Sequence, residues 1–268
     1  NYSYSASAIE VLDGLEPVRQ RPSMYIGGTD NRALHHLAAE ILDNSMDEAV
    51  AGYATRIDIH IDAADRLTIQ DNGRGMPTEK HPKFPDQSAV EVIMTTLHAG
   101  GKFSGKVYAT SGGLHGVGAS VVNALSSELT VQIAREKILY QQQFSRGKPL
   151  GPLTEIGAAP NRRGTSVSFT PDAEIFGAHA KFQPATLFRM AQSKAYLYAG
   201  VEIRWRCNRS LLEADDLVPV ETNLHYPGGL ADYLTDVTTN KALMISTPFA
   251  EIAQFDGQKF EWALTWLG

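Results

Sequence analysis

One acidic stretch constrains this chain more than any other feature. Residues 40–49 read Glu-Ile-Leu-Asp-Asn-Ser-Met-Asp-Glu-Ala. At roughly 100° per residue, their four carboxylates and one amide fall on a single helical arc about 140° wide, opposite an apolar side. The arc holds no basic residue, and like charges at this spacing repel one another. The stretch is therefore either a solvated acidic face or a helix that directs a carboxylate base and a metal-ligating amide into a pocket.

The composition excludes several classes of protein. The chain has 268 residues, is 43% hydrophobic, and can fill one large domain or one and a half. Its net charge of −6 and the absence of a Lys/Arg run argue against a direct nucleic-acid clamp. The single cysteine, Cys207, excludes an intrachain disulfide and a Cys-rich zinc site. No apolar run reaches the ~20 residues of a membrane span, so we expect a cytoplasmic protein without a membrane partner.

The hydrophobic pattern predicts both helices and strands. Asp30 or Thr29 is expected to cap the acidic helix and Gly52 to end it. Strands are expected at 56–62, 67–71, 129–135, 138–145, 164–169 and 201–206, and helices at 88–98, 117–125, 184–197 and 228–234. Segments 249–255 and 260–267 alternate around Asp256-Gly257, a favoured hairpin turn. Because the chain lacks an initiator Met and ends on Trp266-Leu267-Gly268, we expect a fragment. The hairpin has little left to pack on, so we expect it to be the start of a second domain that is cut short.

Two glycine-containing segments suit a nucleotide. Residues 71–77, Asp-Asn-Gly-Arg-Gly-Met-Pro, follow an expected strand. There a carboxylate can accept a hydrogen bond from an exocyclic amine, while glycines let backbone approach a flat ring. Residues 111–118 lead into a helix, whose N-terminal N–H groups suit phosphates. The alternatives are an ordinary turn and a flexible linker. Neither segment matches a Rossmann or Walker motif.

The order of these segments, followed by Gly164-Thr165, resembles that of the GHKL ATPases. The resemblance to one member family, the B subunits of bacterial type IIA topoisomerases, covers essentially the whole chain. It is carried by residues 11–25, 43–49, 97–103, 111–118 and 121–125. Residues 15–18 and 43–47 are more similar to the topoisomerase IV branch than to the gyrase branch.

The resemblance implies an α+β Bergerat fold, in which a mixed, mostly antiparallel sheet carries helices on one face as a two-layer sandwich. It implies a dimerisation arm at residues 1–16 and an ATPase domain at 17–220 with an ATP lid at about 99–118. Residues 221–268 would form the connection and the truncated start of the transducer domain. The arm would reach the neighbouring protomer through Tyr4 and Ile9.

The resemblance also assigns roles to residues. Glu40 matches the general base for hydrolysis, Asn44 the Mg²⁺ ligand, and Asp71 the acceptor for the adenine amine, with Thr165 assisting. Arg135 matches the pocket mouth, where ATP-competitive inhibitors bind. The remaining ATP-binding residues would be Glu48, Arg74, Gly75, Met76, Pro77, Lys102, Tyr108, Leu114, His115, Gly116, Val117 and Gly118. We expect Glu48 to pair with Arg74, and we expect His35 and His36 on the helix surface. Asp43 and Asp47 have no assigned role.

The implied activity is ATP-driven dimerisation that closes a gate for DNA strand passage, with Mg²⁺ as cofactor and a monovalent cation such as K⁺. The implied partners are the A subunit in an A2B2 heterotetramer, a second copy of the B subunit and double-stranded DNA. The lysine that reaches the γ-phosphate in relatives is expected beyond residue 268, so the fragment should hydrolyse ATP poorly. The alternatives are a gyrase-type enzyme that supercoils DNA and a non-hydrolysing, ATP-gated dimerisation or chaperone-like module.

Overall fold

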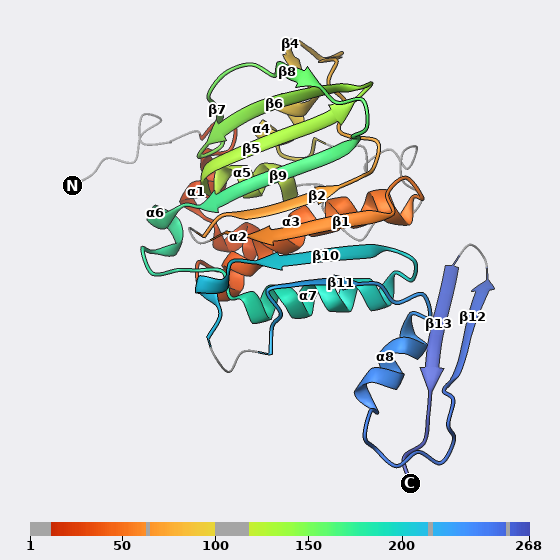
Figure 1. Ribbon diagram of the computed structural model, residues 1–268. Helices are drawn as coiled ribbons and strands as arrows, with labels where there is room; N and C mark the ends of the chain where they lie inside the picture. The colour runs from red at the N-terminus through yellow and green to blue at the C-terminus, as the bar shows by residue number, and fades with distance from the viewer. Residues whose placement is uncertain (1–11, 63–64, 100–117, 214–216, 256–257) are drawn as a thin grey trace.

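The computed structural model describes residues 12–62, 65–99, 118–213, 217–255 and 258–268. Within them, one nine-stranded sheet dominates, with helices packed against one of its faces (Figure 1). The strand order is β11-β10-β1-β2-β9-β5-β6-β7, and β8 also pairs with β6. Among the described strands, β1 and β10 form the only parallel pair. The strands of this sheet are β1 Arg56–Ile61, β2 Leu67–Asp71, β5 Ser126–Arg135, β6 Ile138–Ser145, β7 Lys148–Pro149, β8 Thr154–Ala158, β9 Gly164–Pro171, β10 Glu202–Cys207 and β11 Glu221–Leu224.

The acidic stretch lies on the longest described helix, α3 Asn31–Val50. The Asp30 side chain caps this helix by accepting a hydrogen bond from the backbone N–H of Ala33, and Gly52 follows its end with φ +79°. The other helices are α1 Glu16–Gln20, α2 Ser23–Ile26, α4 Ala89–Thr95, α5 Gly118–Ala124, α6 Ala173–Phe176, α7 Pro184–Leu197 and α8 Leu230–Val237.

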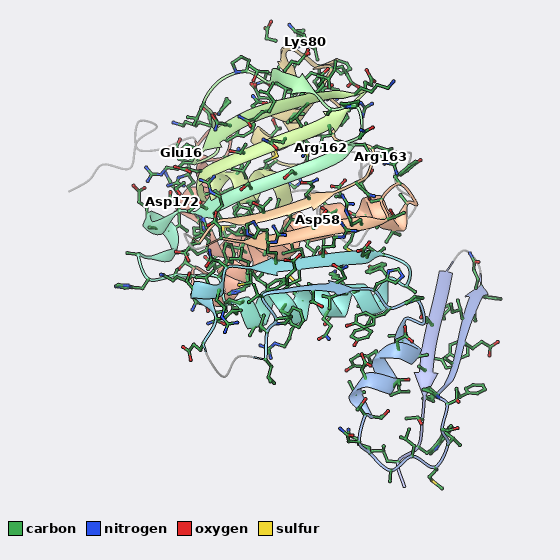
Figure 2. The ribbon with its side chains drawn as sticks, in the orientation of Figure 1. Glu16, Asp58, Lys80, Arg162, Arg163 and Asp172 are labelled. Carbon is green, nitrogen blue, oxygen red and sulfur yellow. The ribbon has the colours of Figure 1, made fainter. Side chains whose placement is uncertain are left out.

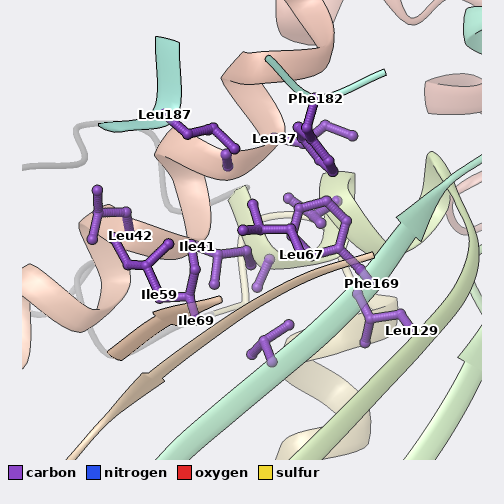
Figure 3. Close-up of a cluster of buried hydrophobic side chains, with 14 of the residues drawn as sticks. Leu37, Ile41, Leu42, Ile59, Leu67, Ile69, Leu129, Phe169, Phe182 and Leu187 are labelled. Carbon is purple, nitrogen blue, oxygen red and sulfur yellow. The ribbon is translucent and has the colours of Figure 1, made fainter. Parts of the chain in front are cut away.

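The core lies between the sheet and its helices (Figure 3). Alternate residues of β1 and β2, such as Ile59 and Ile69, point toward α3 and meet Ile41 there. Leu37 of α3 and Phe169 of β9 extend the same apolar layer. The period-2 strand pattern and the helical pattern thus bury their apolar sides against each other, which fixes which side of α3 faces the sheet.

The other face of the sheet is polar. Asp58 of β1 is partly exposed there (Figure 2), and Thr68 of β2 exchanges a 2.9 Å hydrogen bond with Ser168 of β9. This face needs no second layer of helices, so the two-layer α+β prediction is confirmed.

The C-terminal residues form a separate two-stranded sheet, β12 Phe249–Phe255 and β13 Gln258–Leu264, beside α8 (Figure 1). The predicted hairpin is therefore present. It exposes large apolar side chains, including Phe249, Ile252 and Phe260. The predicted domain boundaries themselves stay a prediction.

The hydrophobic pattern of the sequence did not predict every strand. The hairpin of β3 Lys80–His81 with β4 Phe84–Ser88 and the edge strand β8 have mostly exposed residues and no apolar alternation. By contrast, α7 has the bounds predicted from its sequence. No helix in the described ranges is both long and apolar enough to cross a bilayer.

Candidate functional site

Asp71, the last residue of β2, is a buried carboxylate with only neutral hydrogen-bond partners in the described chain. Its Oδ1 accepts from the backbone N–H groups of Gly73 at 2.8 Å and Thr165 at 3.3 Å. Its Oδ2 accepts from the Ser45 hydroxyl of α3 at 3.4 Å. Burial raises the pKa of Asp71 to about 6, because those hydrogen bonds only partly offset the loss of water.

The loop after Asp71 is held from two sides. The backbone N–H of Met76 donates to the Thr165 hydroxyl at 3.1 Å, and an Arg135 guanidinium nitrogen donates to the carbonyl of Gly75 at 3.1 Å. Gly75 has φ +79°, a conformation that a side chain disfavours. The predicted loop residues and the predicted mouth residue therefore lie together, with Pro77 beside them in the chain.

The expected pair of Glu48 and Arg74 is present. An Arg74 terminal nitrogen lies 2.6 Å from Glu48 Oε1, and the Arg74 backbone N–H donates to Oε2 at 2.9 Å. The guanidinium also stacks over the Tyr53 ring, 3.6 Å from its centroid. A side chain at Gly73 would come within 2.7 Å of Glu48 Oε2, so the pair requires glycine there. These contacts fix the loop against α3.

Glu40 lies at the other end of the site, against the start of α5. A side chain at Gly118 would overlap Glu40 Oε2, so the glycine lets α5 begin directly over this carboxylate. The His36 ring, one turn earlier on α3, places Nδ1 3.7 Å from Glu40 Oε1. The sequence pattern gave His36 only a surface position; its i,i+4 spacing from Glu40 was the available signal.

The structure corrects the predicted position of His35. Instead of lying on the helix surface, it is buried, with Nδ1 2.6 Å from the carbonyl of Asn31. Its Nε2 accepts a hydrogen bond from the backbone N–H of Gln183 at 2.9 Å. The prediction failed because the side of α3 that carries His35 is covered by the segment before α7, which no local pattern reveals.

The acidic arc is not a solvated face. Asp47 is 1% exposed, and Glu40, Asn44 and Glu48 are partly buried. Asp43 forms an ion pair with Lys194 of α7, with 2.6 Å between Nζ and Oδ1. The arc therefore faces three different parts of the fold: α5, the loop after β2, and α7.

A magnesium site built from side chains alone is absent from the described residues, which contain no group of three or more His, Cys, Asp or Glu able to hold a metal. The amide of Asn44, one helical turn after Glu40, offers a single oxygen. That donor set fits Mg²⁺, which commonly takes one or two protein oxygens and completes its shell with phosphate and water.

Several predicted site residues lie outside the described part of the chain. They are the lid residues Lys102, Tyr108, Leu114, His115, Gly116 and Val117, and the arm residues Tyr4 and Ile9. Their assigned roles stay predictions.

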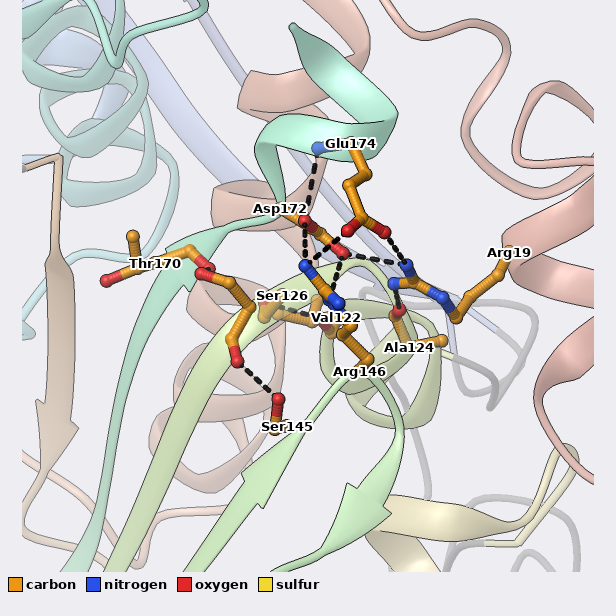
Figure 4. A network of polar contacts seen from close by, with 10 residues as sticks. Arg19, Val122, Ala124, Ser126, Ser145, Arg146, Thr170, Asp172 and Glu174 are labelled. Atoms are coloured by element: carbon orange, nitrogen blue, oxygen red, sulfur yellow. Dashed lines mark hydrogen bonds and ion pairs between the residues drawn. The ribbon is translucent and has the colours of Figure 1, made fainter. Parts of the chain in front are cut away.

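Arg19, which entered the sequence analysis only as part of a motif, anchors α1 to the fold (Figure 4). Its guanidinium donates to the carbonyl of Ala124 at the end of α5 and to Asp172, both at 2.7 Å. Arg146 also pairs with Asp172 at 2.9 Å. Burial alone would raise the pKa of Asp172, but hydrogen bonds from Arg19, the Glu174 backbone and Arg146 outweigh it and hold the pKa below its usual value.

The family follows from the fold and the site taken together. The chain belongs to the histidine kinase-, DNA gyrase B- and HSP90-like ATPases, whose family model matches residues 29–175.

Three individual proteins show how similar this chain is to particular members of the family. The B subunit of DNA topoisomerase 4 from Caulobacter vibrioides is 57% identical over 98% of this chain and 38% of its own length. Its counterpart from Bartonella bacilliformis is 54% identical, with the same coverage. The B subunit of DNA gyrase from Synechocystis is 46% identical over 98% of this chain and 24% of its own length.

A solved structure supports the fold. The 43K ATPase domain of Thermus thermophilus gyrase B, crystallised with an aminocoumarin, superposes with a TM-score of 0.79 at 38% identity. The match covers 92% of this chain and 61% of that one. The chain itself spans 38% of the length of the Caulobacter and Bartonella topoisomerase 4 relatives.

Proposed function

We propose that this chain is the ATP-binding and ATP-hydrolysing domain of a type IIA topoisomerase B subunit of the topoisomerase IV kind. The observation that carries the proposal is the pair of unlike carboxylates at the two ends of one site. Asp71 is buried among neutral donors beside a glycine loop, and Glu40 lies against the start of α5.

The Asp71 end suits the adenine ring. Its carboxylate accepts a hydrogen bond from the exocyclic amine, and a hydrogen bond to a charged acceptor contributes about 1.5–3 kcal/mol. Thr165 holds both this carboxylate and the loop, and Gly75, Met76 and Pro77 line the ring. Arg135, bonded to the carbonyl of Gly75, borders the mouth, where ATP-competitive inhibitors would bind.

The Glu40 end suits the phosphates. Glu40 accepts the proton of the attacking water, and His36 orients the Glu40 carboxylate. Asn44 would hold Mg²⁺, which when bound neutralises phosphate charge. Gly118 and the N–H groups at the start of α5, together with Lys102, Tyr108 and residues 114–117, would surround the phosphate chain. A K⁺ requirement is also proposed, with no residue assigned.

At the level of the whole protein, ATP binding would bring two copies of the B subunit together through the arm at residues 1–16. The dimer would close on a DNA segment within a cytoplasmic A2B2 enzyme that decatenates and relaxes DNA. The higher identity of the topoisomerase 4 relatives supports this branch. Negative supercoiling of relaxed circles by the reconstituted enzyme would instead assign the gyrase function.

The test of the chemistry is Glu40→Gln in the full-length protein with its A subunit. We expect ATP turnover to fall by about 10²–10⁴, the usual contribution of a general base, while nucleotide binding persists. Glu202→Gln is the matched control, because Glu202 pairs with Arg204 at 2.8 Å on β10. Unchanged turnover in Glu40→Gln would contradict the assigned role and would favour the non-hydrolysing module.

A further inference from the structure

The nucleotide-site helix α3 is tied to α7 at two points. Near the start of both helices, the backbone N–H of Gln183 donates to His35. Two turns further along α3, Lys194 of α7 pairs with Asp43 at 2.6 Å. The side chains of Lys194 and Asp43 are 24% and 21% exposed, so solvent screens this ion pair less than a fully exposed one. A displacement of α3 must therefore move α7 or break the pair.

Asp43 occupies a particular place on α3. It precedes Asn44, the proposed Mg²⁺ ligand, and follows Glu40 by three residues. The ion pair with Lys194 therefore joins α7 to the same turn of α3 that would contact the phosphates.

The last turn of α7 is also tied to the C-terminal part of the chain. Tyr196, two residues after Lys194, is 5% exposed and donates a hydrogen bond from its hydroxyl to Asp236 of α8. Its ring stacks on Tyr226 with 3.8 Å between centroids, and Tyr233 of α8 packs edge-on at 5.2 Å. Burial and the hydrogen bond to Asp236 raise the pKa of Tyr196, so its hydroxyl is protonated at neutral pH and can donate to Asp236.

The chain of contacts continues into the C-terminal hairpin. The backbone N–H of Leu230, the first residue of α8, donates to Glu261 of β13 at 3.5 Å. A side chain at Gly229 would come within 2.7 Å of the same Glu261 oxygen, so β13 approaches the start of α8 closely. Contacts thus run without a gap from Asp43 through Lys194, Tyr196 and Asp236 to α8 and β13.

We propose that α7 is a coupling element in which Lys194 and Tyr196 transmit the state of the nucleotide site to α8 and the β12–β13 hairpin. The inference rests on the proposed nucleotide site. Helix shifts of about 1–2 Å are a common response to ligands, and a helix held at one turn by an ion pair and a buried hydroxyl transmits such a shift as a unit. Because coupling is reciprocal, a change at Tyr196 must also alter nucleotide affinity.

The test is hydrogen exchange of this chain with and without Mg²⁺ and a non-hydrolysable ATP analogue. We expect the analogue to slow exchange of the α8 amides by about fivefold or more, the lower end of ordinary coupling. In Lys194→Met the analogue should still bind, while α8 exchange changes by less than about twofold. Tyr196→Phe should change the Kd of the analogue by at least about threefold, although Tyr196 contacts α8 and not the site.

Arg189→Met is the matched control. Arg189 is a cation on the exposed side of the same helix and bonds to the carbonyl of Ala185 within that helix. It should keep the wild-type response. If the ion pair between Lys194 and Asp43 is only structural, Lys194→Met will lower stability, but the analogue will still slow α8 exchange as much as in the wild type. That result overturns the proposal.

The two proposals fail differently. If the wild-type chain does not bind the analogue, the proposed function is wrong. If it binds the analogue and α8 exchange is unchanged, the nucleotide site stands and the coupling role of α7 is wrong.

Discussion

Two buried carboxylates at opposite ends of neighbouring strands have opposite electrostatic surroundings. Strands β2 and β9 pair antiparallel, so Asp71 at the end of β2 and Asp172 after the end of β9 lie at opposite ends of this strand pair. Both are almost fully buried, at 5% and 1% exposure. Asp71 accepts hydrogen bonds only from neutral donors among the described residues, whereas Arg19 and Arg146 both pair with Asp172.

The difference separates a structural carboxylate from one available to a ligand. Asp172 is neutralised by the chain itself, which lowers its pKa even though burial opposes this. No cation among the described residues pairs with Asp71, and its burial raises its pKa to about 6. A shift of this size costs about 3 kcal/mol when the group is ionised at neutral pH. An uncompensated buried acceptor costs stability in the free protein but can bond an incoming donor strongly.

The largest expected effect is the loss of stability when Asp172 is replaced. Asp172→Ala removes the buried carboxylate shared by Arg19 and Arg146 and leaves them only the exposed Glu174, so it should lower the free energy of unfolding by about 2–4 kcal/mol. Thermal unfolding should show Tm lower by roughly 10 °C for a chain of this size. Nucleotide affinity should change less than about twofold, because Asp172 lies at the end of the β2–β9 strand pair opposite to Asp71.

Asp58→Ala is the control for this change. Asp58 pairs with Arg56 at 3.0 Å on the polar face of the sheet, and its loss should cost less than about 1 kcal/mol. Equal costs in the two variants would show that burial of Asp172 contributes nothing to its network.

The next largest expected effect is on nucleotide binding when Asp71 is replaced. Asp71→Asn should weaken nucleotide affinity by about 10- to 100-fold, since a charged acceptor is replaced by a neutral one. Stability at neutral pH should not fall and should rise by up to about 3 kcal/mol, because the buried charge is removed. Calorimetric titration with the ATP analogue and urea unfolding would measure the two quantities. A large loss of stability would mean that Asp71 is a structural group like Asp172.

The two carboxylates should also respond to acid in opposite directions. The raised pKa of Asp71 means that the folded state takes up this proton first, so its ionisation penalty is relieved as pH falls from above 6 to below 3.8. The lowered pKa of Asp172 means that its contribution is intact above 3.8 and is lost as pH falls through the folded value.

Unfolding measured from pH 7 to 3 would separate these windows. The stability advantage of Asp71→Asn over wild type should shrink between pH 6 and pH 4, and the disadvantage of Asp172→Ala should shrink below pH 4. Wild-type nucleotide affinity should fall below pH 6, as Asp71 loses its charge. An affinity that is constant down to pH 4.5 would contradict the assigned role of Asp71.

The smallest expected effect concerns Glu48, whose negative charge contributes to the raised pKa of Asp71. Glu48→Gln removes that charge together with the ion pair between Glu48 and Arg74. Loss of the negative charge should lower the pKa of Asp71, by less than about one pH unit. Carboxyl titration by NMR would follow it, and a rise in the pKa would show that Glu48 acts on Asp71 only by holding the loop.

The sequence was most informative where a local pattern has one physical solution. The helical period predicted that Asp43, Asn44 and Glu40 share an arc, and strand alternation predicted that Asp71 ends a strand. It was least informative for edge elements such as β8 and for His35, whose burial depends on a segment 148 residues away. The resemblance supplied residue roles but left Asp43 unexplained, because its partner Lys194 lies on another helix.

The sequence by itself therefore determined the fold family, the helix that carries the acidic arc, and the identities of Glu40, Asn44 and Asp71 as candidates. Periodicity and spacing are local properties, so they can be read before folding. Tertiary structure alone decided which carboxylates are neutralised. Asp172 acquires its arginines from residues 19 and 146, and Asp71 acquires none among the described residues, because the charge around a buried group depends on which distant segments the fold brings within a few ångströms.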